Sequence, residues 1–141
     1  MPIKNYTTKI PAAQTVGEIQ GILAAHGARQ IMLDYQDNGH IGAIAFSIDT
    51  PAGRRGFQLP ARAELVLKTL GKQRVKADYD QAERVAWRIL KDWVDAQMAI
   101  LESEQVEMAE IFLPYMLSDK GQTLYQVVRE NPLMLGGAEH E

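Results

Sequence analysis

Residues 80–117 constrain the fold most, because they form the longest run of helical periodicity in the chain and contain both tryptophans. At about 3.6 residues per turn, the apolar side chains of this run form two separate stripes on one helix. The first stripe consists of Ala82, Val85, Ala86, Ile89, Trp93, Ala96 and Ile100, and the second of Trp87, Leu90, Val94, Met98 and Leu101. Since a helix on one surface needs only one apolar stripe, the sequence predicts contacts with two surfaces.

The second stripe has two interpretations. In one, the terminal segment 124–135 of the same chain covers it. In the other, it forms a symmetric helix–helix interface between two copies, with Trp87 as the central residue. Because the terminal segment is short for so long a stripe, we expect a homodimer whose interface contains Trp87, Leu90, Val94, Met98 and Leu101.

Residues 1–60 predict a small, mainly antiparallel sheet with one crossover helix, in the order β-α-β-β-β. Residues 3–10 alternate imperfectly and are rich in Thr and Tyr, which favours an edge strand. Thr15 and Glu18 have the spacing of a capping box and predict the start of the helix. Gly27 is expected to end that helix, because glycine readily adopts the left-handed conformation.

Three further strands are predicted at residues 29–35, 41–48 and 54–59. The first two flank Asp37-Asn38-Gly39, which is a strong signal for a tight turn. Residues 50–53 predict the next turn, so these three strands are expected to form a meander.

The second half of the chain is predicted to be helical. A helix at residues 61–70 leads into a basic connector, residues 71–80, which lacks an apolar period and is expected to be mobile. Asp80 is predicted to cap the long helix, with Glu83 as its box partner. Residues 102–104 are polar all round and predict a break in that helix.

Pro114 predicts a second bend or end of the helix, and residues 123–129 predict a short last helix. The expected fold class is therefore α+β, a small mainly antiparallel sheet followed by a long C-terminal helix and short helices. The expected organisation is one domain at residues 1–135, with a sheet part at 1–60 and a helical part at 61–135, then a disordered tail at 136–141.

Charge is unevenly placed along the chain. Residues 1–79 carry ten Lys and Arg against six Asp and Glu, whereas residues 80–141 carry five against twelve. A basic first half can meet an anion or the acidic half of another copy, and plain solvated charge is the alternative. The chain has no cysteine, no long apolar run and no secretion signal of the usual kind, so we expect a cytoplasmic protein without membrane contact.

None of the common catalytic or nucleotide-binding motifs occurs in the sequence. His26, His40 and His140 fall in different expected elements, so we expect no metal site. His26 lies in the last turn of the first helix, where it suits the helix dipole. We therefore expect no catalysis and no cofactor.

Basic residues near turns are the most usable chemical feature. Arg54 and Arg55 follow the 50–53 turn, with Phe57 two residues on, and three more cations lie in the connector. A guanidinium group binds phosphate oxygens two at a time, and an aromatic ring stacks on a base. The predicted nucleic-acid- or nucleotide-binding set is Arg54, Arg55, Phe57, Lys72, Arg74 and Lys76. The alternatives are that Phe57 belongs to the core and that Arg55 only protects an edge strand.

Four stretches of the sequence, IKNYTTKI, TVGEIQGILAAHGA, ERVAWRILKDWVDAQMAILE and EIFLPYML, share one resemblance. Together they resemble a family of small bacteriophage- and prophage-encoded proteins without an established activity. The resemblance runs from about residue 3 to about residue 126, and residues 83–97 are its most specific part. It implies a mobile-element origin, the cytoplasm of a bacterial host and an accessory role, with no site residues to transfer.

Three functions are compatible with these observations. We expect first a non-catalytic accessory protein that contacts nucleic acid or a nucleotide through the basic loops. The second is a protein–protein interaction module, such as an inhibitor of a host defence protein, acting through the acidic half or the second apolar stripe. The third is an enzyme, which requires a deep pocket with convergent titratable groups.

Overall fold

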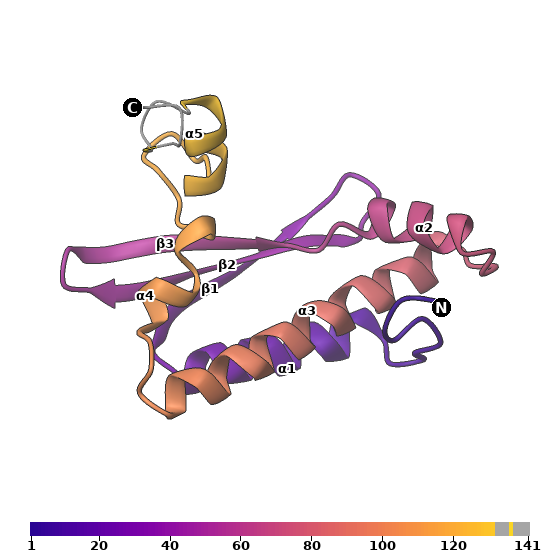
Figure 1. Ribbon diagram of the computed structural model, residues 1–141, viewed down its shortest axis with the longest axis horizontal. Coiled ribbons are helices and arrows are strands. Elements are labelled where there is room, and N and C mark those ends of the chain that lie inside the picture. Colours follow the sequence, from indigo (N-terminus) through magenta and orange to yellow (C-terminus); the bar gives the residue numbers. More distant parts are fainter. Residues whose placement is uncertain (132–135, 137–141) are drawn as a thin grey trace.

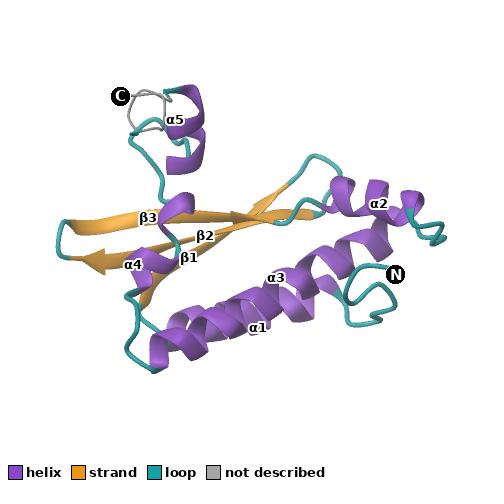
Figure 2. Cartoon of the chain, in the orientation of Figure 1, coloured by secondary structure: helices purple, strands orange, loops and turns teal. Residues whose placement is uncertain are grey.

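The computed structural model describes residues 1–131 and Gly136. Within them, one antiparallel sheet packs against a pair of long helices, so the predicted α+β class is confirmed (Figures 1 and 2). The elements are α1 Ala12–Ala25, β1 Ala28–Tyr35, β2 Ile41–Thr50, β3 Gly53–Pro60, α2 Ala63–Lys72, α3 Tyr79–Glu102, α4 Met108–Ile111, the 3₁₀ turn η1 Leu113–Tyr115 and α5 Leu124–Glu130. Apart from Gly136, the predicted tail at residues 136–141 lies outside the described residues.

The three strands form an antiparallel meander in the order β1-β2-β3, as the turn signals predict. Gly39 and Gly53 close the two turns with backbone φ angles of 84° and 101°, values that side chains other than glycine rarely adopt. Phe46 lies opposite Ile31 on one neighbour and Phe57 on the other, so alternate residues build one apolar face.

The predicted first strand at residues 3–10 is wrong, because these residues form a loop. The backbone groups that a sheet would use are taken by side chains from elsewhere in the chain. The Gln81 amide donates to the carbonyls of Tyr6 and Thr8, at 3.0 and 2.9 Å, and Ile3 N donates to Gln73 Oε1 at 2.9 Å. The strand pattern here was local, and strand formation depends on a neighbouring strand to pair with.

The predicted capping box at Thr15 and Glu18 is also wrong. Helix α1 begins at Ala12, so both side chains lie inside the helix, and no side-chain bond caps its start at Pro11. Glu18 instead accepts hydrogen bonds from Arg88 of α3. The predicted end is correct, since Gly27 follows the helix with a φ of 104°.

The apolar face of the sheet packs on α1 and α3, which run side by side beneath it (Figure 1). Phe46, Phe57 and Phe112 form an aromatic cluster, with ring centroids 5.1 to 6.4 Å apart. The fully buried aliphatic residues around it come from α1, β2, β3 and α3, and include Ile19, Leu23, Ile44, Leu59 and Val94. One core therefore joins the predicted sheet part and the predicted helical part.

The second apolar stripe of α3 faces this core, so its prediction as a dimer interface is wrong. Trp87 and Val94 are completely buried within the single chain, and Met98 is 4% exposed. Leu90 and Leu101 are half-buried and pack against the same cluster. Trp87 Nε1 donates to the carbonyl of Ile41 in β2 at 3.2 Å, which fixes the indole under the sheet. Of the first stripe, Ala82, Val85 and Ala86 are buried in the same chain as well, whereas Ile100 near the end of α3 is 36% exposed. A homodimer stays a prediction without the support of the second stripe.

The ends of α3 differ from the prediction in one respect. Asp78, not Asp80, caps the helix, because its side chain accepts from Gln81 N at 2.9 Å. Glu83, the predicted box partner, binds His40 Nδ1 at 2.9 Å instead. At the other end the helix stops at Glu102, where the polar run predicts a break.

The connector before α3 is shorter than predicted. Helix α2 continues through Gly71 to Lys72, so the loop contains only residues 73–78. Glycine lowers helix stability by about 1 kcal/mol relative to alanine, which is too little to end a helix supported by packing on α3. After the break, Pro114 lies in η1, and Thr123 caps α5 with Gln126 in a capping box.

Candidate functional site

The six predicted nucleic-acid-binding residues do not converge. Arg54 and Arg55 lie at the start of β3, beside the turn to β2, and we call residues 49–55 together with Arg29 of β1 the hairpin end. Lys72, Arg74 and Lys76 lie beyond the other end of β3, around the loop between α2 and α3 (Figure 1). The eight residues of β3 alone separate the two groups by roughly 25 Å, at about 3.3 Å per residue.

At the hairpin end, the cationic side chains already have partners. Arg54 Nε donates to Asp49 Oδ1 at 2.9 Å, and this hydrogen bond is the main reason why the pKa of Asp49 lies below its ordinary value. Arg29 Nε lies 3.9 Å from the second oxygen of Asp49. Arg55 turns back to the backbone, where Nη1 donates to the carbonyl of Arg54 at 3.3 Å. Asp49 therefore offsets one of the three positive charges that Arg29, Arg54 and Arg55 bring to this region.

Phe57 is not available as a stacking surface, so its prediction as a base platform is wrong. Its side chain is completely buried between the sheet and the helices. The ring stacks on Phe46 with centroids 5.5 Å apart and meets Phe112 edge-on. The alternative interpretation, a core residue, is correct.

The opposite end of the molecule gathers cations without ion partners among the described residues, and we call it the basic end. Its four cations are Lys9, Lys72, Arg74 and Lys76, none of which makes an ion pair within residues 1–131. Lys9 and Lys76 line the same shallow hollow of about 600 Å³, together with Tyr6, Thr7 and the start of α3. Three of the predicted cations therefore lie near a fourth from the N-terminal loop. Lys9 is absent from the predicted site, because it lies in residues 3–10, which the sequence predicts as a strand.

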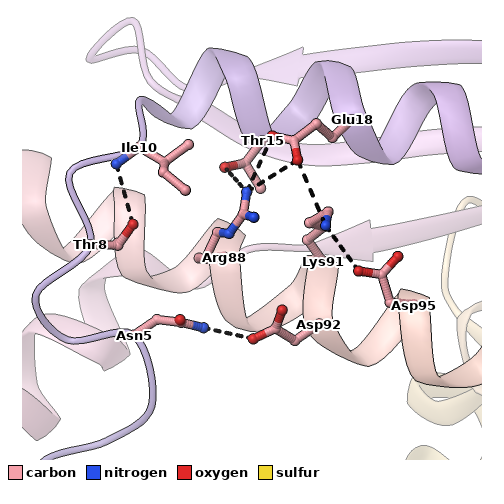
Figure 3. A network of polar contacts seen from close by, with 9 residues as sticks. All are labelled: Asn5, Thr8, Ile10, Thr15, Glu18, Arg88, Lys91, Asp92 and Asp95. Carbon is pink, nitrogen blue, oxygen red and sulfur yellow. Dashed lines mark hydrogen bonds and ion pairs between the residues drawn. The ribbon is translucent and has the colours of Figure 1, made fainter.

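The N-terminal loop is tied to α3 by polar contacts, among them the hydrogen bond between Asn5 and Asp92 (Figure 3). Tyr6 and Lys9 of this loop line the same hollow as Lys76 of the α2–α3 loop. Asp92 accepts from Asn5 Nδ2 at 2.8 Å and lies 3.1 Å from Lys4 Nζ. Burial acts to raise the pKa of Asp92, but the hydrogen bonds from Asn5 and Lys4 outweigh it, so the pKa lies below its ordinary value. The carboxylate that holds the loop is thus stabilised in its charged form.

A second polar network joins α1 to α3 farther along (Figure 3). Arg88 Nη1 lies 3.2 and 3.3 Å from the two oxygens of Glu18 and 3.5 Å from Thr15 Oγ1. Lys91 Nζ lies 3.7 Å from Glu18 and 2.9 Å from Asp95. The two cationic side chains are about four-fifths buried, with 18% and 17% exposed. These charges neutralise one another, so the network positions α1 on α3 and leaves no free acid–base pair.

The histidines also act between elements. His40, next to the β1–β2 turn, lies 2.9 Å from Glu83 and 3.5 Å from Asp80, both on α3. His26, at the end of α1, has Nε2 at 3.2 Å from Glu102 Oε1 and Nδ1 at 2.7 Å from the carbonyl oxygen of Ile22. Within residues 1–131 and Gly136, no three His, Asp or Glu side chains group closely enough to hold a metal ion.

A larger groove lies between α2 and α3, and no pattern in the sequence predicts it. It has a volume of about 750 Å³, and η1, α5 and the end of β3 complete its walls. Leu65 of α2 and Tyr125 of α5 are 50% and 59% exposed on it, while Trp93 of α3 is half-buried. Arg62, just before α2, is the one ionic residue among the described residues that line it. We call it the α2–α3 groove.

Comparison of the chain with protein-family models, with curated proteins and with solved structures finds no match. The resemblance to bacteriophage and prophage proteins therefore stays a prediction. Among the described helices, none is both long enough and apolar enough to cross a membrane.

Proposed function

We propose that this chain is a non-catalytic accessory protein that binds nucleic acid through its basic end. The observation that carries the proposal is the gathering of Lys9, Lys72, Arg74 and Lys76 at one end without ion partners among the described residues. Phosphate groups attract such cations, and the release of counterions from nucleic acid supplies most of the affinity.

The arrangement favours contact with the phosphate backbone over reading of base edges. Lysines are point charges on flexible stems, and Arg74 is the only guanidinium group among the four cations. The three acids nearest to these cations already have partners. Asp78 caps α3, Asp80 lies 3.5 Å from His40, and Asp92 holds the N-terminal loop. They therefore oppose an incoming phosphate less than free carboxylates would.

Tyr6 adds a contact that favours single strands. Its side chain is 37% exposed and lines the same hollow as Lys9 and Lys76. An exposed aromatic ring beside cations can stack on an unpaired base, whereas bases in a duplex are already stacked. A nucleotide or a single strand is thus the preferred ligand class in this proposal.

The experiment is fluorescence anisotropy of labelled single- and double-stranded oligonucleotides at about 50 and 200 mM salt, the range over which phosphate contacts lose most affinity. The test variant is the triple substitution Lys72→Gln, Arg74→Gln and Lys76→Gln. The matched control, Arg29→Gln, Arg54→Gln and Arg55→Gln, removes the same charge at the hairpin end. We expect the test variant to lose at least tenfold in affinity, with a shallower salt dependence, and the control to change by less than threefold.

Equal losses in the two variants would mean that only net charge matters and would contradict a site at the basic end. No binding of the unmodified chain at the lower salt would end the proposal. A protein partner is then the second candidate, through the exposed acids Glu104, Glu107 and Glu110 after α3, because the apolar stripe of the earlier alternative is buried. Its test is a stable complex in a pull-down from bacterial lysate that is lost in a Glu104→Gln, Glu107→Gln variant.

A further inference from the structure

The α2–α3 groove has the form of a ligand site and lies apart from the basic end. Its volume of about 750 Å³ falls within the range of roughly 300–1,000 Å³ that is typical of small-molecule sites. The apolar lining comes from α2, α3 and η1, and includes Leu65, Val66, Ile89, Leu90, Trp93 and Tyr115. An apolar molecule in this groove removes the half-exposed Leu65 side chain and the Trp93 ring from water, which favours binding.

Charge in the groove is restricted to one position. Among residues 1–131, Arg62 is its single ionic lining residue, and its side chain makes no ion pair and no hydrogen bond there. It precedes the first residue of α2, where the helix dipole adds positive potential. A bound anionic group therefore gains a partner at Arg62, and a cationic group does not.

We propose that the α2–α3 groove binds an apolar organic anion, with its carboxylate or sulfonate on Arg62 and its aromatic or aliphatic body against Leu65, Leu90 and Trp93. A guanidinium group suits such an anion, because its fork donates two parallel hydrogen bonds. The aromatic rings of Trp93 and Tyr115, with centroids 6.0 Å apart, form a rigid side wall for a planar body. The proposal does not depend on nucleic-acid binding, since Arg62 is not part of the basic end.

Two dyes of similar shape and different charge test this site. Anilinonaphthalene sulfonate carries the anion, and phenylnaphthylamine is its neutral counterpart. We expect the unmodified chain to bind both dyes at one site, measured by fluorescence titration. Arg62→Gln is expected to lower the affinity for the sulfonate dye by about tenfold and to leave the affinity for the neutral dye unchanged.

Two further variants control for charge and for position. Lys68→Gln removes the same charge from α2 at a residue that does not line the groove. It should change the affinity for neither dye by more than about twofold. Leu65→Ser changes a side chain that is 50% exposed, and it should lower the affinity for both dyes several-fold. Cooperative thermal unfolding of each variant confirms that the fold is retained. Equal effects of Arg62→Gln and Lys68→Gln, insensitivity to Leu65→Ser, or no binding by the unmodified chain would each overturn the proposal.

Discussion

The hairpin end and the basic end present the same residue types beside turns, but among the described residues Arg54 of the hairpin end forms an ion pair, whereas none of the four cations of the basic end does. In the antiparallel pairing of β2 and β3, Asp49 lies opposite Arg54, so an acid and a base on facing strands meet. At the basic end, the nearby acids bind other groups: Asp78 accepts from Gln81 N at the start of α3, Asp80 lies 3.5 Å from His40, and Asp92 accepts from the Asn5 side chain. Cations that are clustered in the sequence therefore keep no ion partner where the nearby acids bind elsewhere.

The largest effect should come from the residue on which both ends depend. Trp87→Ala empties a completely buried position between α3 and the sheet, and such truncations cost about 3–5 kcal/mol of unfolding free energy. Because one core joins the sheet to the helices, we expect both ends to lose protection together in a single denaturant transition. Two separate transitions would show that the two ends unfold independently. A loss below about 1 kcal/mol would show that Trp87 does not hold them together.

A smaller effect is expected from acid at the basic end. The folded-state pKa of Asp92 is lowered, so its charged form contributes stability that is complete above the unfolded pKa, about 3.9, and is lost as pH falls through the folded value. We expect residues 1–10 to become more susceptible to acid-tolerant proteases, or to exchange amide hydrogens faster, below about pH 4.

Asp92→Asn separates this carboxylate from other acid effects. At neutral pH it should destabilise the loop by about 1 kcal/mol, because a charge-assisted hydrogen bond is replaced by a neutral one. It should also remove most of the added exchange of residues 1–10 in acid. Asp49→Asn serves as the matched variant, since the pKa of Asp49 is lowered as well but its side chain is 58% exposed. An equal effect of both variants on the N-terminal loop would contradict the assignment to Asp92.

The smallest effect is expected at the hairpin end. Asp49→Asn removes the acid that pairs with Arg54 and lies near Arg29, so these cations lose their ion partner. We expect affinity for a single-stranded oligonucleotide to rise by about twofold at about 50 mM salt and to be unchanged at about 200 mM, because exposed charges act weakly and are screened. An unchanged or lower affinity at about 50 mM salt would show that the hairpin end does not attract the ligand through its charge.

Local backbone chemistry made much of the fold predictable. The turns at Gly39 and Gly53, the end of α1 before Gly27 and the break after Glu102 all follow from residues whose preferences act within a few positions. The pairing of Asp49 with Arg54 could also have been inferred, since the predicted turn at residues 50–53 places these residues opposite each other. That signal would have removed Arg54 from the candidate site.

The failed predictions share a different cause. Residues 3–10 have the pattern of a strand, but Gln81 and Asp92, more than seventy positions away, take their polar groups. Thr15 and Glu18 have the spacing of a cap, but α1 begins at Ala12, and both side chains bind Arg88 of α3 from inside the helix. In both cases the side chains bind distant partners, and the local preference, worth about 1 kcal/mol, does not decide the structure.

The sequence alone predicts the α+β class, the meander of three strands and the two stripes of α3, although residues 3–10 form a loop and not the predicted strand. Packing between distant residues buries Phe57 and the centre of the second stripe in the chain's own core, and it brings Lys9 close to Lys76. Periodicity specifies which face of an element is apolar, because it depends on neighbours along the chain. It does not specify what covers that face or where charges meet, because those depend on packing between residues far apart in sequence.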